Sequence, residues 1–403
     1  MTPTKLGPVT SGIPKKLRPN RDKPLSKAST RAKPAPSQTF SFNLKPADIA
    51  RHLNRFVIGQ NEAKKVLSVA LCDHFQHVRL TLEGHESPFY QKQNVLLLGP
   101  TGVGKTHLIR SAADLIGVPF VKADATKFSE TGYVGGDVDD LVRDLIRRAG
   151  GDVNRASHGI IYLDEVDKLA ASREGGGRDV SGRGVQTNML KILEDGDVPV
   201  MSQNDVSGQL QAAMSAARGN TPGMPDTIST RHILFIASGA FVGIDAIVRD
   251  RIGNLKLSVE NTISRASTAD FISFGLEPEF VGRLPVRVAC HALDEDDLFH
   301  VLSRSESSLI RQYERAFAAY GIKIHFQDSA LRRLASLARE EQTGARGLMT
   351  VLERAFRELK FRLPSSKVKS LTITAETIDK PMQALQTALG KGTPRARKAS
   401  SAG

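Results

Sequence analysis

One segment restricts the fold more than any other, and it reads "NVLLLGPTGVGKTHLIRSAADLIG" at residues 94–117. An apolar run is followed by a loop of the form G-x-x-x-x-G-K-T and then by a helical pattern. The backbone N–H groups of such a loop favour a bound phosphate, because the dipole of the helix that follows attracts anions. An ordinary glycine turn would need neither the strand nor the helix. The segment therefore predicts a strand–loop–helix unit with a nucleotide site at the end of the strand.

The loop gives specific roles to two of its side chains. Lys105 is predicted to reach the β- and γ-phosphates of a nucleotide, and the hydroxyl of Thr106 is predicted to bind Mg²⁺. The expected cofactors are therefore ATP and Mg²⁺. The predicted phosphate-binding residues are Gly99, Pro100, Thr101, Gly102, Val103, Gly104, Lys105 and Thr106.

Two further apolar runs end in polar side chains. In "GIIYLDEVDK", residues 160–163 predict a short buried strand that brings Asp164 and Glu165 to the same sheet edge as the phosphate loop. Asp164 suits a direct or water-mediated Mg²⁺ contact, and Glu165 suits a general base that activates the attacking water. In "HILFIASGAF", Ser238 ends a third strand, where it could hold that water or the γ-phosphate. Alternatively, the two acids could be solvated residues that cap a strand, and the serine an ordinary turn residue. That alternative does not explain why both acids directly follow a buried strand downstream of a phosphate loop.

Strands that alternate with helices predict a doubly wound α/β fold, with a parallel sheet flanked by helices. After Cys290 the pattern changes to amphipathic helices with the short extended pieces "IKIHF" and "SLTIT", which predicts a smaller, mostly α second domain. Cys72 and Cys290 are the only cysteines, so we expect reduced thiols and no four-cysteine zinc module. The predicted divisions are a tail at 1–43, a large ATPase domain at 44–288, a small domain at 289–385 and a tail at 386–403.

The formal net charge of +13 belongs to the two ends of the chain. Residues 1–45 carry ten Lys or Arg and one acid, and residues 391–403 carry four bases and no acid, so the body between them is neutral. The first forty residues are rich in Pro, Ser and Thr and contain few apolar side chains. This composition predicts a disordered arm. The arm could contact nucleic acid or an acidic partner, or act only as a solubilising tail. A transit peptide is a third alternative, which the prolines oppose.

The longer motifs resemble the AAA+ family of ring ATPases, and most closely its ClpX-type protein unfoldases, over residues 44–385. The ATPase subunit of the HslUV protease is similar in fewer segments, and its long insertion and docking tail have no counterpart here. The resemblance implies an AAA+ P-loop NTPase core with a small lid domain, assembled as a homo-hexameric ring. It is carried by "RFVIGQNEAKKVLSVA", "GPTGVGKT", "ADATKFSETGYVGGDV", "IIYLDEVDK", "RDVSGRGVQ", "GLEPEFVGRLPV" and "TGARGL".

The resemblance also implies residue roles. Val57 and Ile58 of "VIGQ" would pack on the adenine. Arg283 of "EFVGRLPV" matches the arginine that reaches the γ-phosphate of a neighbouring subunit. Arg346 of "TGARGL" matches the sensor 2 arginine, which contacts the phosphates of its own subunit, and Ser238 stands at the sensor 1 position. The expected catalytic residues are Glu165, Arg283 and Ser238.

In this family the segment that here reads "GYVG" is a pore loop. Glycines let the loop move, and the aromatic and aliphatic side chains grip unfolded or tagged proteins in the channel without reading their sequence. Residues 178–186 are similar to the second pore loop, with Arg183 where the family usually has an acid. The implied pore-loop residues are Gly132, Tyr133, Val134 and Gly135.

Three features depart from the family. A basic arm stands where the zinc-binding domain would be, so no zinc is expected, and residues 200–230 lack the basic loop that engages peptide tags. The family docks a ClpP-type peptidase through an Ile-Gly-Phe loop. Here Ile252 and Gly253 precede Asn254, so the docking motif is degraded, unless Leu255 or Leu257 fills the peptidase pocket from a shifted register.

Three functions compete at this level. A protein unfoldase is favoured by the aromatic pore loop, and a nucleic-acid-associated AAA+ motor is suggested by the basic tails but weakened by the neutral body. A non-motor nucleotide switch is disfavoured by the intact Lys105, Glu165 and Arg283. No apolar run reaches membrane-helix length and no signal peptide is evident, so we expect a bacterial cytoplasmic protein in preference to one of the mitochondrial matrix, with no membrane contact.

Overall fold

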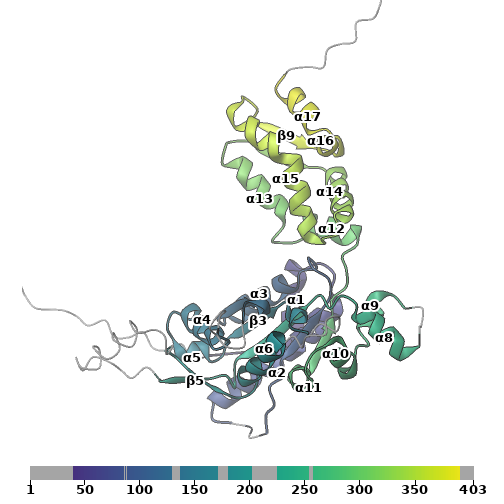
Figure 1. Cartoon of the computed structure of the whole chain (residues 1–403). Coiled ribbons are helices and arrows are strands. Elements are labelled where there is room, and N and C mark those ends of the chain that lie inside the picture. Colours follow the sequence, from purple (N-terminus) through teal and green to yellow (C-terminus); the bar gives the residue numbers. More distant parts are fainter. Residues whose placement is uncertain are drawn as a thin grey trace, which may run out of the picture. The chain divides into compact units, whose positions relative to one another are not determined.

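The computed structural model describes residues 40–85, 87, 89–128, 137–170, 180–201, 225–253 and 257–390, and its elements are labelled in Figure 1. The strands are β1 (Val95–Leu98), β2 (Phe120–Asp124), β3 (Ile160–Asp164), β4 (Asp197–Pro199), β5 (Thr227–Ser229), β6 (Leu234–Gly239), β7 (Val286–Ala289), β8 (Lys323–Phe326) and β9 (Ser370–Ile373). Short 3₁₀ helices are η1 (Ala125–Lys127), η2 (Val166–Leu169) and η3 (Leu363–Ser365).

The α-helices before β7 are α1 (Pro46–Phe56), α2 (Asn61–Leu82), α3 (Lys105–Ile116), α4 (Asp140–Arg148), α5 (Val153–Ala156), α6 (Val180–Leu193), α8 (Ile244–Ile252), α9 (Val259–Ile263), α10 (Thr268–Phe274) and α11 (Pro278–Gly282). Those after β7 are α12 (Glu295–Ser303), α13 (Leu309–Ala318), α14 (Asp328–Glu340), α15 (Ala345–Arg362), α16 (Ala375–Asp379) and α17 (Pro381–Ala388).

Five strands form one parallel sheet in the order β2-β3-β6-β1-β7. Strand β1, the first of this sheet along the chain, thus lies between β6 and β7, the last two of this sheet along the chain. In open α/β sheets, ligands bind beyond the carboxyl ends of the strands where the strand order reverses. The sheet confirms the predicted α/β fold and brings the ends of β1, β6 and β3 together as neighbours.

Both faces of this sheet are buried, because alternate residues of each strand belong to different apolar clusters. On one face, Val95, Leu97 and Tyr162 pack with residues of α1, α2 and α3. On the other face, Leu96 and Leu163 pack with residues of α4, α6 and α8. Burial on both sides explains why the central strands read as continuous apolar runs.

The three predicted strands correspond to β1, β3 and β6, which are confirmed. The sequence does not predict β2 and β7, the two edge strands, because charged residues interrupt their apolar patterns. Lys122 stands in the middle of β2, and Arg287 stands within β7. Edge strands tolerate such residues, since one side of an edge strand is open to solvent.

The chain after β7 forms a separate apolar core, as predicted. Helices α12 to α17 pack around buried residues such as Leu334 and Phe356, and the predicted extended pieces pair in parallel as β8 and β9. A capping box starts this region: the Asp294 carboxylate accepts a hydrogen bond from the Asp297 N–H of α12 at 2.7 Å. Figure 1 shows α12 to α17 gathered with β9, in green to yellow.

Two predicted segments differ from expectation in their details. Residues 180–186 of the expected second pore loop are the start of helix α6, and Arg183 there forms an ion pair with Glu277 at 3.1 Å. Packing begins before the predicted start at residue 44, because Phe42 is buried against Phe75. Gly132, Tyr133, Val134 and Gly135 lie outside the described residues.

The two cysteines are free and buried, as predicted for reduced thiols. Burial raises the pKa of both Cys72 and Cys290 to about 11, so neither is a reactive thiolate at neutral pH. In the part of the chain that the structure describes, no helix combines the length and apolar character that crossing a membrane requires.

Candidate nucleotide site

The phosphate loop between β1 and α3 leaves the first amides of the helix available to a ligand. Gly104 precedes α3 with a φ of 96°, a left-handed conformation that glycine adopts at little cost. The N–H groups that follow have no partner within the helix and suit an anion. The ammonium of Lys105 donates to the carbonyl oxygens of Gly99 and Pro100, the latter at 2.9 Å. Burial lowers the pKa of Lys105, and the nearby Arg346 adds to that effect.

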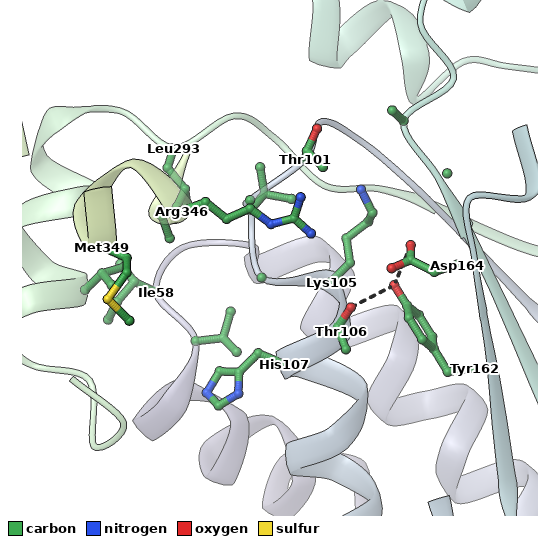
Figure 2. Close-up of a pocket in the computed structure, with 18 of the residues that line it drawn as sticks. Ile58, Thr101, Lys105, Thr106, His107, Tyr162, Asp164, Leu293, Arg346 and Met349 are labelled. Atoms are coloured by element: carbon green, nitrogen blue, oxygen red, sulfur yellow. Dashed lines mark hydrogen bonds between the residues drawn. The ribbon is translucent and has the colours of Figure 1, made fainter. Parts of the chain in front are cut away.

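Side chains from β3 and β6 form a hydrogen-bonded group at the end of the sheet. The Ser238 hydroxyl donates to Asp164 Oδ1 at 2.8 Å and lies 2.6 Å from the Tyr162 hydroxyl. The Tyr162 hydroxyl also lies 3.4 Å from Asp164 Oδ1 and 3.5 Å from Thr106 Oγ1, as the dashed lines of Figure 2 mark. Because β6 lies between β1 and β3, Ser238 connects Asp164 to the strand that carries the phosphate loop.

Glu165 follows this group in an unusual backbone conformation. Its φ is 62°, in the left-handed region that non-glycine residues seldom adopt. Such a residue costs on the order of 1 kcal/mol and persists where the surroundings hold it. Its N–H donates to Asp164 Oδ1 at 3.2 Å, and its exposed side chain lines the cavity beside the loop. The turn therefore separates two adjacent carboxylates, with Asp164 in the hydrogen-bonded group and Glu165 in the cavity wall.

A cavity of about 560 Å³ lies against the phosphate loop. Cavities of roughly 300–1,000 Å³ hold ligands of nucleotide size. One side is polar, with Lys105, Thr106 and Asp164, and the other side is apolar. Apolar walls of this kind suit a purine ring. The apolar lining residues include Val57, Ile58, Leu293, Val301, Leu309 and Met349.

The C-terminal region contributes to the cavity through a direct backbone contact. The Ala345 N–H donates to the Gly102 carbonyl of the phosphate loop at 2.9 Å. A side chain at Gly102 would collide with the Thr343 carbonyl, so the loop needs glycine for this approach. Arg346 follows at the start of α15, and Figure 2 shows its side chain extending toward Lys105. Two cations thus enter the phosphate side of the cavity from different parts of the chain.

The residues present fit Mg²⁺. The Thr106 hydroxyl and an Asp164 carboxylate oxygen contact one common cation, the Lys122 ammonium, at 3.1 and 2.7 Å. Burial raises the pKa of Asp164, but hydrogen bonds from Lys122 and Ser238 outweigh it, so the pKa lies below its usual value and the group is a carboxylate. Oxygen donors suit Mg²⁺, which takes few protein ligands beside phosphates and water. Among the described residues, no three His, Cys, Asp or Glu side chains gather as a protein-only metal site would require.

Most of the predicted nucleotide residues meet at this cavity. Ser238 reaches it through Asp164, while Gly99 and Pro100 contact Lys105. The predicted residues that line the cavity directly are Val57, Ile58, Thr101, Gly102, Val103, Gly104, Lys105, Thr106, Asp164, Glu165 and Arg346.

Arg283 lies apart from this group of predicted residues, and it does not line the cavity. It follows α11, its side chain is about half exposed, and its guanidinium lies 2.5 Å from the Glu194 carboxylate. The structure therefore places Arg283 outside the candidate phosphate site of its own chain.

The structure adds residues that the motifs do not single out. Tyr162 lies inside the strand "IIYLD" and Lys122 inside "FVKAD", and both contact the predicted magnesium ligands. The alternation of side chains along a strand could have identified them. Lys122 and Tyr162 are partners in the register of the neighbouring parallel strands β2 and β3, so their side chains lie on the same face of the sheet. His107 and Asp167 also line the cavity, next to residues that the motifs contain.

Two family models together match most of the chain between residues 90 and 367. Residues 90–287 match the AAA domain (Cdc48 subfamily), and residues 293–367 match the C-terminal, D2-small domain of ClpB protein. The two matches meet between β7 and α12, where the structure passes from the sheet to the helical core.

The chain is similar to curated relatives over most of their length. The chain is 40% identical over 359 residues to "ATP-dependent Clp protease ATP-binding subunit ClpX 3" of Methylococcus capsulatus, covering 83% of this chain and 80% of the relative. It is 38% identical over 370 residues to the ClpX subunit of Borrelia duttonii, covering 89% and 81%, respectively. With the ClpX subunit of Azotobacter vinelandii it shares 38% over 341 residues, covering 79% and 74%.

Proposed function

The chain belongs to the ClpX-type AAA+ ATPases, and on this basis we propose that it is a protein unfoldase that threads polypeptides through the pore of a homo-hexamer. As a member of this family it is an ATPase that uses a nucleotide and Mg²⁺. The relatives are named as ATP-binding subunits of Clp proteases, which supports protein substrates for this chain. The main structural support for ATP hydrolysis is that the phosphate loop, the Asp164–Ser238 group and Arg346 meet at one cavity.

In the proposed reaction, the amides at the start of α3 and the Lys105 ammonium bind the β- and γ-phosphates. Glu165 accepts a proton from the attacking water, and the Ser238 hydroxyl orients that water or the γ-phosphate. Mg²⁺, when held by Thr106 and Asp164, neutralises phosphate charge. Arg346 adds positive charge from the C-terminal side.

We also propose that residues 44–288 and 289–385 act as the two domains that each ATPase cycle moves against one another. Support comes from the separate apolar cores and from the change of family model between residues 287 and 293. The Ala345–Gly102 hydrogen bond joins the smaller domain to the phosphate loop. A movement of the loop on nucleotide binding would therefore be transmitted to that domain.

Tyr133 is the proposed grip on the substrate, from its place in "GYVG". Aromatic side chains supply apolar contact area to any polypeptide without a hydrogen-bonding code. Several subunits present the loop together in a ring, so weak individual contacts multiply.

Replacing Tyr133 with alanine should separate ATP hydrolysis from mechanical work. We expect ATP turnover within about threefold of wild type and unfolding of a stable protein slowed more than about tenfold, since the lost contacts act together. The measurements are phosphate release, with and without an unfolded protein or single-stranded DNA, and loss of fluorescence from a folded substrate. Tyr320→Ala, which removes a tyrosine that is 64% exposed, is the matched control. Unchanged unfolding would reject this role, and stimulation by DNA alone would favour a nucleic-acid motor.

We further propose that docking to a ClpP-type peptidase is weak. Ile252 ends helix α8 and packs against the apolar core, and Gly253 caps the helix with a φ of 81°. Both residues are therefore held by the fold of this chain. A docking anchor, by contrast, should be free to insert into the pocket of the peptidase. Asn254, outside the described residues, stands where an apolar anchor would contribute about 2 kcal/mol by burial, and an unpaired amide there would oppose binding.

Asn254→Phe should strengthen that docking. We expect wild-type rings to degrade an unfolded substrate slowly with the host's ClpP-type peptidase, and the variant to do so about tenfold faster, because the anchors act together in a ring. Peptide release is the measurement, with ATP turnover as the control. Fast degradation by the wild type that stops when residues 252–258 are deleted would contradict the proposal and favour Leu255 or Leu257 as the anchor.

A further inference from the structure

Lys122 occupies a central place in the nucleotide site although no motif contains it. It lies on the edge strand β2, in register with Tyr162 on β3. Its ammonium donates to Asp164 Oδ2 at 2.7 Å and to Thr106 Oγ1 at 3.1 Å, and lies 5.7 Å from the centre of the Tyr162 ring. The side chain is about one third exposed, so it has room to move.

We propose that Lys122 is a built-in counter-ion of the magnesium position, which holds Thr106 and Asp164 together while no metal is bound and has to withdraw when the metal binds. The inference rests on the proposed nucleotide site and deepens it. Lys122 is a positioning residue in this scheme, since it acts through the two metal ligands.

Geometry sets the competition between the two cations. Mg²⁺ binds oxygen at roughly 2.0–2.1 Å and demands nearly octahedral geometry. An ammonium that hydrogen-bonds the same two oxygens occupies the space between them, and two cations a few ångströms apart repel strongly in a partly buried site. Lys122 cannot keep both hydrogen bonds while Thr106 and Asp164 bind the metal.

The charge of Lys122 opposes the binding of Mg²⁺. The ammonium neutralises the Asp164 carboxylate, which is only 18% exposed. Without Lys122 that carboxylate would lack its nearest positive partner and attract a divalent cation more strongly. Lys105 acts on the Asp164 carboxylate only through its charge, because its ammonium donates to the carbonyl oxygens of Gly99 and Pro100, whereas Lys122 donates a hydrogen bond to the carboxylate itself. Lys122 therefore raises the Mg²⁺ concentration needed to load the site, and it supports nucleotide binding when Mg²⁺ is scarce.

The test is an equilibrium titration of Mg²⁺ into the full chain with a fluorescent ATP analogue, which requires no turnover. Lys122→Met keeps the length of the side chain and removes its charge. Because solvent screens a partly exposed ammonium, we expect the half-saturating Mg²⁺ concentration to fall by about tenfold, and nucleotide affinity in EDTA to fall by a similar factor. Lys127→Met, on the neighbouring η1, is the matched control and should match wild type.

Lys122→Arg keeps the charge and should stay within about threefold of wild type, which a role limited to packing would not predict. Thermal unfolding of each variant checks that the fold persists. An unshifted Mg²⁺ titration for Lys122→Met, or equal shifts for the Met and Arg variants, would overturn the inference while leaving the proposed function intact. If the wild-type chain itself bound no nucleotide, the proposed function would fail and this inference with it.

Discussion

Replacing Glu165 with glutamine should leave ATP affinity within about twofold of wild type and slow hydrolysis by about 10²–10⁴-fold, the usual contribution of a general base. Glutamine keeps the size of the side chain but cannot accept the proton of the attacking water. The phosphate contacts are unaffected, since they come from the loop and from Lys105. Phosphate release under saturating ATP measures the loss, and a fluorescent nucleotide measures affinity.

The backbone of Glu165 makes this substitution a clean one. Its left-handed conformation depends on the turn after β3 and on the N–H bond to Asp164, neither of which involves the side chain. Glu83→Gln, an exposed carboxylate paired with Arg79 at the end of α2, is the control and should hydrolyse ATP normally. Intact binding with turnover reduced less than tenfold would show that another group is the base.

The sequence predicts the three central strands of the sheet and the phosphate side of the site because both depend on local patterns. The strand–loop–helix around Lys105 is contiguous, and the acids of β3 directly follow an apolar run. Parallel strands whose carboxyl ends share one edge then bring these segments together, so Asp164 and Ser238 meet within a hydrogen bond.

The remaining features depend on pairings between distant segments, which one sequence does not reveal. Lys122 and Asp164 are neighbours only because β2 lies beside β3 in a particular register. The approach of Ala345 to Gly102 joins segments over two hundred residues apart, and nothing in "TGARGL" identifies its partner without the resemblance. The positive φ of Glu165 is a product of the turn and of its hydrogen bond to Asp164, since glutamate has no preference for that conformation.

Replacing Arg283 with alanine should leave nucleotide affinity nearly unchanged and lower turnover by about 10³-fold or more, as for arginines that stabilise phosphoryl transfer in trans. Arg283 lies outside the cavity of its own chain, so its loss removes no nucleotide contact there. Its pair with Glu194 is half exposed, and such pairs contribute about 0–1 kcal/mol, so a neighbouring phosphate could displace the carboxylate. Phosphate release and nucleotide fluorescence measure the two effects.

Glu194→Gln breaks the same ion pair and keeps the arginine. If the pair serves only stability, both variants should lower the melting temperature alike and hydrolyse ATP alike. If Arg283 acts on a neighbour, only Arg283→Ala should lose turnover, while Glu194→Gln should stay within about threefold of wild type. This comparison separates a structural role from a catalytic one without reference to assembly.

Mixing the two inactive variants tests whether the arginine acts across subunits. An Arg283→Ala chain keeps its own Glu165, and a Glu165→Gln chain keeps its own Arg283. A ring that places them side by side therefore contains sites with Glu165 from one subunit and Arg283 from the next, and these sites should hydrolyse ATP although neither variant does so alone. Activity should be greatest near equal proportions, because mixed interfaces are then most frequent. Full activity of a wild-type monomer on a sizing column, or no recovery in mixed rings of confirmed composition, would mean that Arg283 completes the site of its own chain.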